Sequence, residues 1–275
     1  MQSFDYPLKN KRQQQLHFRE WKVEWPRAVV CLVHGLGEHI GRYDHVARFL
    51  AGRNFATLGF DHQGHGRSEG KKGHTSGLGS MLEDVDLLLA QATEKYPLVP
   101  VFLYGHSMGG NVALNYTLSR KPVITGLIAT APWIQLPKPP SPFLVLFGKL
   151  MNRIAPALTQ ANGLDTNGLS NDPKVIEAYL KDPLVHDRIS VRAGTSLLTG
   201  AEFLDKFEGS LPCPTLLMHG AIDLITSPQG TAAFAKRAKG DLTWKEWKGL
   251  KHEIHNEVQQ NEVLAFLVEW MERYL

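Results

Sequence analysis

The sequence predicts an α/β protein with a doubly wound, mostly parallel sheet and an inserted, mostly helical cap. Short apolar runs alternate with amphipathic stretches along the chain, as expected when buried parallel strands alternate with the helices that cover them. The length of 275 residues suffices for one large domain with an insertion and is short for two independent domains. One long segment near the middle of the chain lacks a clear strand, and this segment is the expected insertion.

The apolar runs are the expected strands. They are residues 28–33, 55–60, 101–104, a run within 123–131, 215–218 and 243–247. The amphipathic stretches predict helices over residues 43–53, 80–96, 110–120, 228–239 and 257–274. Residues 16–24 alternate more loosely and predict an antiparallel edge hairpin with the segment before them.

The insertion divides the chain into a core, residues 1–131 and 207–275, and a cap, residues 132–206. An insertion after a central strand of a parallel sheet lies over the carboxyl ends of the strands, where ligands bind. The cap opens with a proline cluster and continues with the run 143–151, which is apolar on nearly all sides. This run either packs against the core or a second copy of the chain, or it presents a surface that docks on lipid.

Net charge, cysteine content and hydropathy limit the binding partners and the cellular compartment that we expect for this chain. A net charge of +3 is too small to predict a nucleic-acid partner and does not oppose contact with an anionic membrane. The two cysteines, Cys31 and Cys213, lie in apolar runs and are expected to be buried free thiols. The N-terminus is polar, and no run is long and apolar enough for a signal segment or a bilayer span. We therefore expect a cytoplasmic protein whose contact with membranes is at most peripheral.

A nucleophile motif follows the expected strand 101–104. The sequence Gly105-His106-Ser107-Met108-Gly109 fits G-x-S-x-G, with an apolar strand before it and a helix pattern after it. Glycine is needed on both sides of the serine because neighbouring backbones pass very close to this strained turn. The N-terminus of the following helix directs amide groups at a developing oxyanion. We predict that Ser107 is the nucleophile of a serine hydrolase.

A serine hydroxyl is a weak nucleophile, so it needs a base, and the base needs an orienting acid. With the G-x-S-x-G turn, the acid and then the histidine follow the serine in the chain. Asp223 follows the expected strand 215–218 and is the predicted acid. Asp61 also follows an expected strand, but it precedes Ser107 in the chain, so we expect it to have a structural role. The last loop offers two histidines, and we predict His252 rather than His255 as the base.

The oxyanion hole needs a second amide donor from the loop after an earlier strand. The loop His34-Gly35-Leu36-Gly37 has the required glycines, so the predicted donors are the backbone amides of Leu36 and Met108. Several histidines crowd the strand ends near the site, but their spacing matches no standard zinc pattern and the cysteines lie elsewhere. We expect no metal and no cofactor.

Six segments together resemble the monoacylglycerol lipase and lysophospholipase family of α/β-hydrolases: HGLGEH, the GRY of residues 41–43, DHQGHGRSEG, GHSMGG, HGAID and HEIH. They occur in the family's order between residues 29 and 257. The resemblance implies that Ser107, Asp223 and His252 are nucleophile, acid and base, and that the Leu36 and Met108 amides bind the oxyanion. It also implies that Glu38, Arg42 and His255 lie near the glycerol end of the substrate. The alternative for Glu38 and Arg42 is a structural ion pair.

The chain departs from the family at two positions. The animal enzymes have a cysteine shortly after the catalytic aspartate, where this chain has Thr226. Smaller residues are common where this chain has Leu36, which predicts a tighter mouth of the acyl pocket.

The expected reaction is two-step hydrolysis of a carboxylic ester through an acyl-enzyme. The favoured substrate is a monoacylglycerol, reached from a lipid surface and cleaved to free fatty acid and glycerol. The alternatives are a lysophospholipase, a broad-specificity carboxylesterase, an aminopeptidase-like hydrolase and a non-catalytic ligand-binding protein. Epoxide hydrolases and haloalkane dehalogenases of this fold use aspartate at the position of Ser107, which disfavours them.

Overall fold

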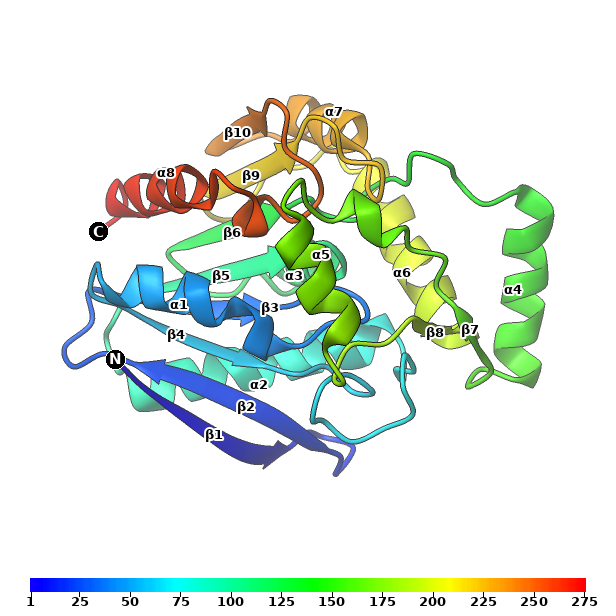
Figure 1. Cartoon of the computed structure of the whole chain (residues 1–275), viewed down its shortest axis with the longest axis horizontal. Coiled ribbons are helices and arrows are strands. Elements are labelled where there is room, and N and C mark those ends of the chain that lie inside the picture. Colours follow the sequence, from blue (N-terminus) through cyan, green and yellow to red (C-terminus); the bar gives the residue numbers. More distant parts are fainter.

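The computed structural model describes residues 1–275 and is built around one eight-stranded sheet (Figure 1). Its spatial order is β1-β2-β4-β3-β5-β6-β9-β10. The strands are β1 (Gln2–Lys9), β2 (Gln15–Lys22), β3 (Ala28–Val33), β4 (Phe55–Phe60), β5 (Val101–His106), β6 (Gly126–Thr130), β9 (Thr215–Gly220) and β10 (Leu242–Trp247). The six strands from β4 to β10 in this order pair in parallel, and β1 and β2 form the antiparallel edge. The predicted fold class and edge hairpin are confirmed.

The central strands are mostly apolar and buried, as expected for a sheet with helices on both faces. Strand β3 shows how one strand serves two cores, since successive side chains point to opposite faces. Val29, Cys31 and Val33 belong to one buried cluster, and Val30 and Leu32 belong to the other. Both cysteines are free and buried, as predicted.

The five predicted helices contribute to these two cores. Helices α1 (Asp44–Ala51) and α8 (Gln260–Glu272) contribute to the cluster with Val30 and Leu32. Helices α2 (Leu78–Lys95), α3 (Met108–Arg120) and α7 (Pro228–Arg237) contribute to the cluster on the opposite face. Each of the five predicted helices is present, with ends that differ from the predicted ones by a few residues.

The segment 132–206 contains α4 (Pro142–Ile154), β7 (Thr159–Ala161), η2 (Thr166–Gly168), α5 (Pro173–Lys181), β8 (Arg188–Ser190) and α6 (Val191–Asp205). It is mostly helical, as expected, but β7 and β8 pair as a small antiparallel sheet. Helix α6 contributes Leu197 and Leu204 to the same buried cluster as α3. The division into a core and a cap of residues 132–206 stays a prediction.

Helix α4 lies at the far edge of the molecule, beyond α6 (Figure 1). Pro142 occupies its first turn, and Ser141 caps it by accepting a hydrogen bond from the Leu144 amide. None of its side chains is buried. The alternative in which the run 143–151 packs against the core is therefore wrong. None of the helices combines the length and the hydropathy that crossing a bilayer requires.

Candidate active site

Ser107 lies on a sharp turn between β5 and α3. Its backbone has φ 54° and ψ −115°, a conformation that a non-glycine residue adopts only under constraint. A Cβ atom on Gly105 would meet the carbonyl oxygen of Gly109, and one on Gly109 would meet the carbonyl oxygen of Val33. The glycines are needed for the reason that the sequence suggested, because they let α3 begin directly against the strand ends.

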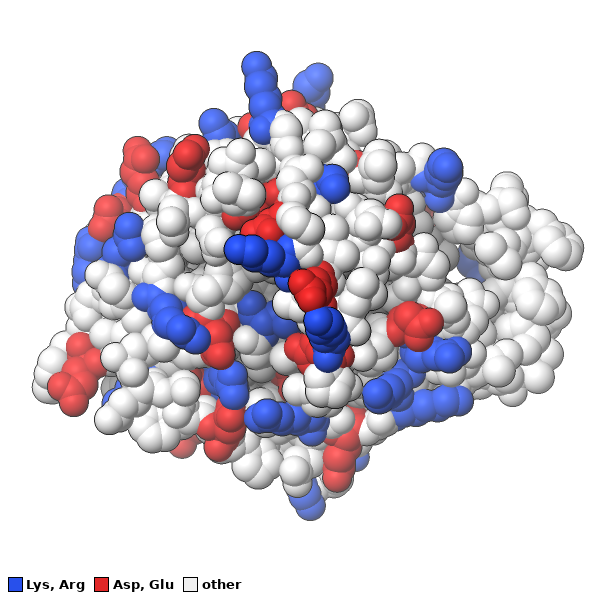
Figure 2. Space-filling model, viewed as in Figure 1, with Lys and Arg blue, Asp and Glu red and all other residues white.

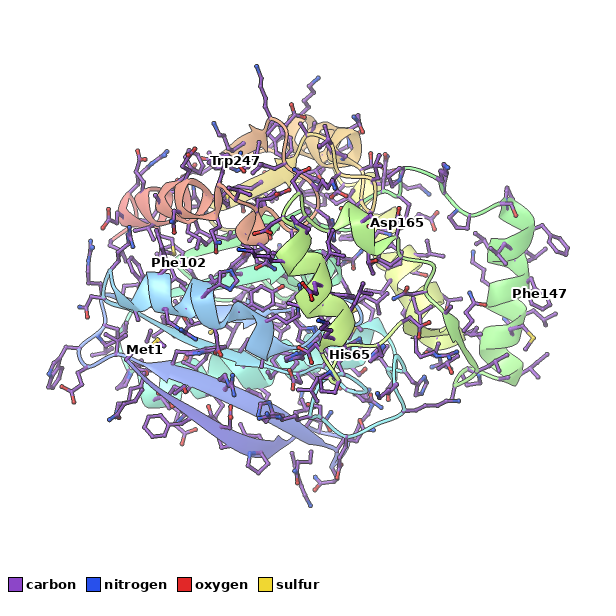
Figure 3. The ribbon with its side chains drawn as sticks, viewed as in Figure 1. Met1, His65, Phe102, Phe147, Asp165 and Trp247 are labelled. Atoms are coloured by element: carbon purple, nitrogen blue, oxygen red, sulfur yellow. The ribbon has the colours of Figure 1, made fainter.

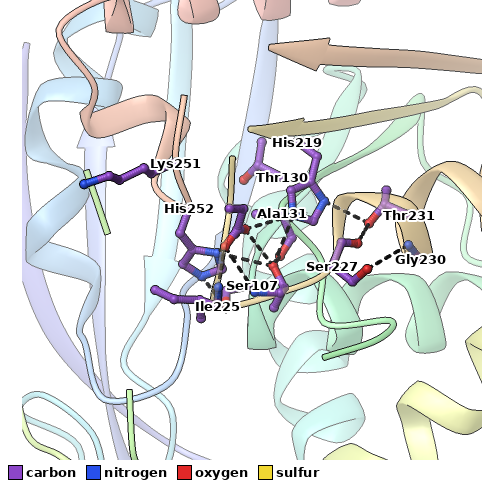
Figure 4. A network of polar contacts seen from close by, with 12 residues as sticks. Ser107, Thr130, Ala131, His219, Ile225, Ser227, Gly230, Thr231, Lys251 and His252 are labelled. Carbon is purple, nitrogen blue, oxygen red and sulfur yellow. Dashed lines mark hydrogen bonds and ion pairs between the residues drawn. The ribbon is translucent and has the colours of Figure 1, made fainter. Parts of the chain in front are cut away.

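Ser107 and His252, both labelled in Figure 4, form one chain of hydrogen bonds with Asp223. The His252 Nε2 atom lies 2.9 Å from Ser107 Oγ, and His252 Nδ1 lies 2.7 Å from Asp223 Oδ2. A carboxylate only accepts hydrogen bonds, so Nδ1 carries the proton and Nε2 is free to accept from the serine hydroxyl. The structure thus brings together the three residues that the sequence predicted as nucleophile, base and acid.

Asp223 and His252 shift each other's pKa in opposite directions. Burial alone would raise the pKa of Asp223, but the neighbouring His252 and His219 hold it well below the ordinary value. Burial alone would lower the pKa of His252, but the charge and hydrogen bond of Asp223 raise it above the ordinary histidine value. An imidazole of this kind is a competent general base for a hydroxyl.

The predicted oxyanion donors belong to two different elements near Ser107. Met108 is the first residue of α3, so its amide N–H has no partner within the helix. Leu36 belongs to the loop after β3 and lines the same cavity as Ser107 and His252. The carbonyl oxygen of Gly37, the next residue, accepts a 2.9 Å hydrogen bond from the His186 amide, which ties this loop to the segment before β8.

A cavity of about 520 Å³ opens above these residues. Ser107 and His252 lie in its wall together with Leu36 and Glu38. Apolar side chains supply much of the remaining lining, among them Trp133, Leu136, Leu224 and Ile225. Such a cavity suits a substrate with an apolar chain and one polar end.

The three residues predicted at the glycerol end are not equivalent in the structure. Glu38 lines the cavity, whereas Arg42 and His255 lie behind its wall. The Arg42 guanidinium donates to Glu38 at 2.6 Å and to both oxygens of Glu253 at 2.6 and 2.7 Å. The other Glu38 oxygen accepts from the Gly35 amide at 2.6 Å and from the Tyr43 hydroxyl at 2.7 Å. The structural ion pair considered for Glu38 and Arg42 is present, and it includes Glu253 as a third member.

These contacts keep Glu38 ionised. Burial alone would raise the pKa of Glu38, but Arg42 and its other neighbours lower it to about 2. Glu38 is therefore ionised near neutral pH, and each of its oxygens already accepts at least one hydrogen bond. His255 is buried and its ring stacks on Tyr43, with neither ring nitrogen hydrogen-bonded.

The structure adds a polar residue that the sequence did not single out. Asn162 of the insertion lines the cavity. Its Oδ1 atom accepts a 2.9 Å hydrogen bond from the Leu164 amide, which fixes the orientation of the carboxamide. The Nδ2 atom is buried and has no partner. Asn162 lies in a segment without a recognisable motif. The only signal for it in the sequence is the neighbouring Gly163, which is typical of a turn.

Comparisons with known proteins identify a family and several similar chains. The profile of the serine aminopeptidase family, S33, matches residues 24–259. A monoacylglycerol lipase of Mycolicibacterium smegmatis is 33% identical over 91% of this chain and 90% of its own length. Phospholipase YtpA of Bacillus subtilis is 32% identical over 93% of this chain and 99% of its own length. An uncharacterized abhydrolase domain-containing protein of Dictyostelium discoideum is 36% identical, but the match spans only 27% of that longer protein.

The crystal structure of Paleococcus ferrophilus monoacylglycerol lipase superposes on this chain with a TM-score of 0.85, at 35% identity and over the full length of both chains. The fold and the arrangement of serine, histidine and aspartate define a serine hydrolase of the α/β-hydrolase class. Within that class, the chain belongs to the monoacylglycerol lipase and lysophospholipase family, as its motifs predicted.

Proposed function

We propose that this chain hydrolyses monoacylglycerol to free fatty acid and glycerol, with Ser107, His252 and Asp223 as nucleophile, base and acid. The observation that carries the proposal is the hydrogen-bonded chain from Ser107 to Asp223 in the wall of a largely apolar cavity. Two of the similar proteins are themselves monoacylglycerol lipases, one compared by sequence and one by structure.

The geometry accounts for each step of an acyl transfer. His252 Nε2 takes the proton of Ser107 as its Oγ attacks the ester carbonyl, and Asp223 stabilises the imidazolium that forms. The amides of Leu36 and Met108 bind the oxyanion of the tetrahedral intermediate. His252 then protonates the leaving alcohol, and a water molecule repeats the sequence on the acyl-enzyme. No residue of the site needs a metal, and no cluster of ligating side chains suitable for one is present.

A peripheral contact with the lipid surface belongs to the same proposal. Phe143, Leu146 and Phe147 of α4 are each at least half exposed. Figure 2 shows acidic and basic side chains interspersed over much of the visible face. At the right-hand edge of the view, where Figure 1 places α4, the outer surface shows no charged side chain. Phe147 lies at this outer edge (Figure 3). Helix α4 contains Lys149 and Arg153 and no acidic residue, which suits an anionic interface.

A second candidate function is the hydrolysis of lysophospholipids, which the similarity to a bacterial phospholipase favours. A hydrolysis panel decides between the two: mono-, di- and triacylglycerols, lysophospholipids and short-chain esters, all at equal enzyme concentration. We expect the highest kcat/KM for a monoacylglycerol. A higher kcat/KM for a lysophospholipid of the same chain length would reassign the substrate.

The nucleophile is tested separately with a fluorophosphonate probe. The wild-type chain should be labelled, and Ser107→Ala should fold, remain unlabelled and lose on the order of 10⁴- to 10⁶-fold in hydrolysis rate. If Ser107→Ala kept a tenth of the wild-type turnover, the proposed mechanism would be wrong.

A further inference from the structure

Two imidazole rings, those of His219 and His252 in Figure 4, bind Asp223. Its Oδ2 atom accepts a 2.7 Å hydrogen bond from His252 Nδ1 and a 2.8 Å hydrogen bond from His219 Nε2. Thr226 Oγ1 lies 2.9 Å from the same oxygen. The side chains of His219 and Asp223 are both fully buried, so their contact is shielded from solvent.

The proton positions on His219 follow from its partners. Nε2 must carry a proton because the carboxylate can only accept. Burial holds the pKa of His219 below the ordinary histidine value, although Asp223 opposes this shift, so the ring is neutral and Nδ1 has a free lone pair. The hydroxyl of Thr231 lies 2.9 Å from Nδ1 and donates to it. One fixed line of donors therefore runs from Thr231 through His219 to Asp223.

Rigid elements hold this line in place. His219 lies near the end of β9, and Thr231 lies in the first turns of α7, whose N-terminus is capped by Ser227. A Cβ atom on Gly220 would meet the carbonyl oxygens of Leu250 and Lys251, so β9 ends directly against the loop that carries His252. His219 thus approaches Asp223 from the sheet, on a different element from the loop of His252.

We propose that His219 is a positioning residue of the reaction: it fixes Asp223 Oδ2 opposite His252 Nδ1 and shares the negative charge of that carboxylate. The inference rests on the proposed function, because it assigns a second partner to the proposed catalytic acid. His219 does not touch Ser107 or the cavity, so it acts only through Asp223 and His252.

Loss of the His219 donor has a definite consequence for the base. A carboxylate that loses a hydrogen bond is less stabilised and interacts more strongly with a neighbouring imidazolium. The pKa of His252 then rises further, and the acid limb of the kcat/KM profile moves to higher pH. The other titratable groups that face His252 stay unchanged in such a variant; they are Glu38, His106, Glu253 and His255.

The experiment compares His219→Phe with His219→Gln on a water-soluble p-nitrophenyl ester. Phenylalanine removes the donor, and we expect kcat to fall about tenfold or more with KM within about twofold, together with a shift of the acid limb to higher pH. Glutamine places an N–H group near the position of Nε2. The Gln variant should therefore have a kcat within about threefold of the wild type and an acid limb at the wild-type pH. His62→Phe is a matched control, because His62 is an equally buried histidine without a side-chain hydrogen bond.

An unmoved acid limb in His219→Phe, or equal impairment of the Phe and Gln variants, would overturn the inference. If His219→Phe does not fold, as judged by circular dichroism, Thr231→Val tests the same line of donors: the limb should again move to higher pH, and a wild-type profile would contradict the inference. Probe labelling of the wild type and of Ser107→Ala, measured in parallel, separates this outcome from a failure of the proposed function.

Discussion

His255 stacks on Tyr43 with ring centroids 4.9 Å apart, and neither of its ring nitrogens has a hydrogen-bond partner. His252, three residues earlier, has both nitrogens bonded, one to Ser107 and one to Asp223. Burial holds the pKa of His255 well below the ordinary value, whereas Asp223 raises the pKa of His252. Two histidines of one short loop therefore have different chemistry, and this difference comes from their partners.

The first prediction separates these two histidines. His252→Ala should abolish labelling by a fluorophosphonate, because no base remains to take the proton of Ser107. His255→Phe should keep labelling within about threefold, because it keeps an aromatic ring of similar size and removes no hydrogen bond. Thermal unfolding of both variants controls for misfolding. Labelled His252→Ala together with inactive, folded His255→Phe would show that the base has been assigned to the wrong residue.

The second prediction concerns pH. Catalysis needs neutral His252, and its pKa lies above 6.5, the ordinary histidine value. The value of kcat/KM for an uncharged ester should therefore be full above this raised pKa and fall as the pH drops through it. Initial rates measured across a series of overlapping buffers give the midpoint. An acid limb centred at or below 6.5 would mean that Asp223 does not raise the pKa of the base in solution.

The local parts of the site could be predicted from the sequence because each depends on neighbouring residues. Strands β3 and β4 have the predicted bounds, since a strand buried on both faces is a continuous apolar run ended by polar residues. The turn at Ser107 was equally clear, because its glycines are demanded by contacts within one strand–turn–helix unit.

Other features depend on residues far apart in the chain. Strands β7 and β8 have three residues each, which is too short for a periodic pattern, and they exist only because they pair. The apolar run of α4 was compatible with burial or exposure, since periodicity does not reveal what a helix packs against. Asn162 gains its place in the cavity wall only from the fold of the insertion, so no local motif could have assigned it. His219 binds Asp223 within the HGAID segment, but the sequence does not show that the two side chains meet.

The third prediction tests helix α4. If α4 docks on lipid, Leu146→Glu or Phe147→Glu should weaken binding to anionic vesicles, because each substitution places a negative charge in the lipid interface. Hydrolysis of a water-soluble ester should stay unchanged, since neither residue lines the cavity. Val123→Glu is a matched control, because Val123 is a fully exposed apolar residue outside α4. Unchanged vesicle partitioning of both α4 variants would exclude these two positions from the lipid contact.

The fourth prediction concerns the leaving alcohol. A monoacylglycerol offers two free hydroxyls beside its ester, and Asn162, which lines the cavity, has a buried Nδ2 donor without a partner. A lost hydrogen bond of this kind is worth about 0.5–1.5 kcal/mol, so Asn162→Ala should lower kcat/KM for monoacylglycerol about 2- to 13-fold. A p-nitrophenyl ester of equal chain length has no such hydroxyls and should be hydrolysed at nearly the wild-type rate. Asn167→Ala, an exposed asparagine of the same segment outside the cavity, is the control.

Glu38→Gln should behave differently from Asn162→Ala on the same two substrates. Glu38 accepts hydrogen bonds from Gly35, Tyr43 and Arg42, so the loss of its charge leaves the buried Arg42 partly unpaired and loosens the loop that carries Leu36. We therefore expect similar losses of kcat/KM on monoacylglycerol and on the p-nitrophenyl ester, with a lower Tm. A loss confined to monoacylglycerol would instead mean that Glu38 binds the glycerol hydroxyls directly, and that its contact with Arg42 serves to orient it.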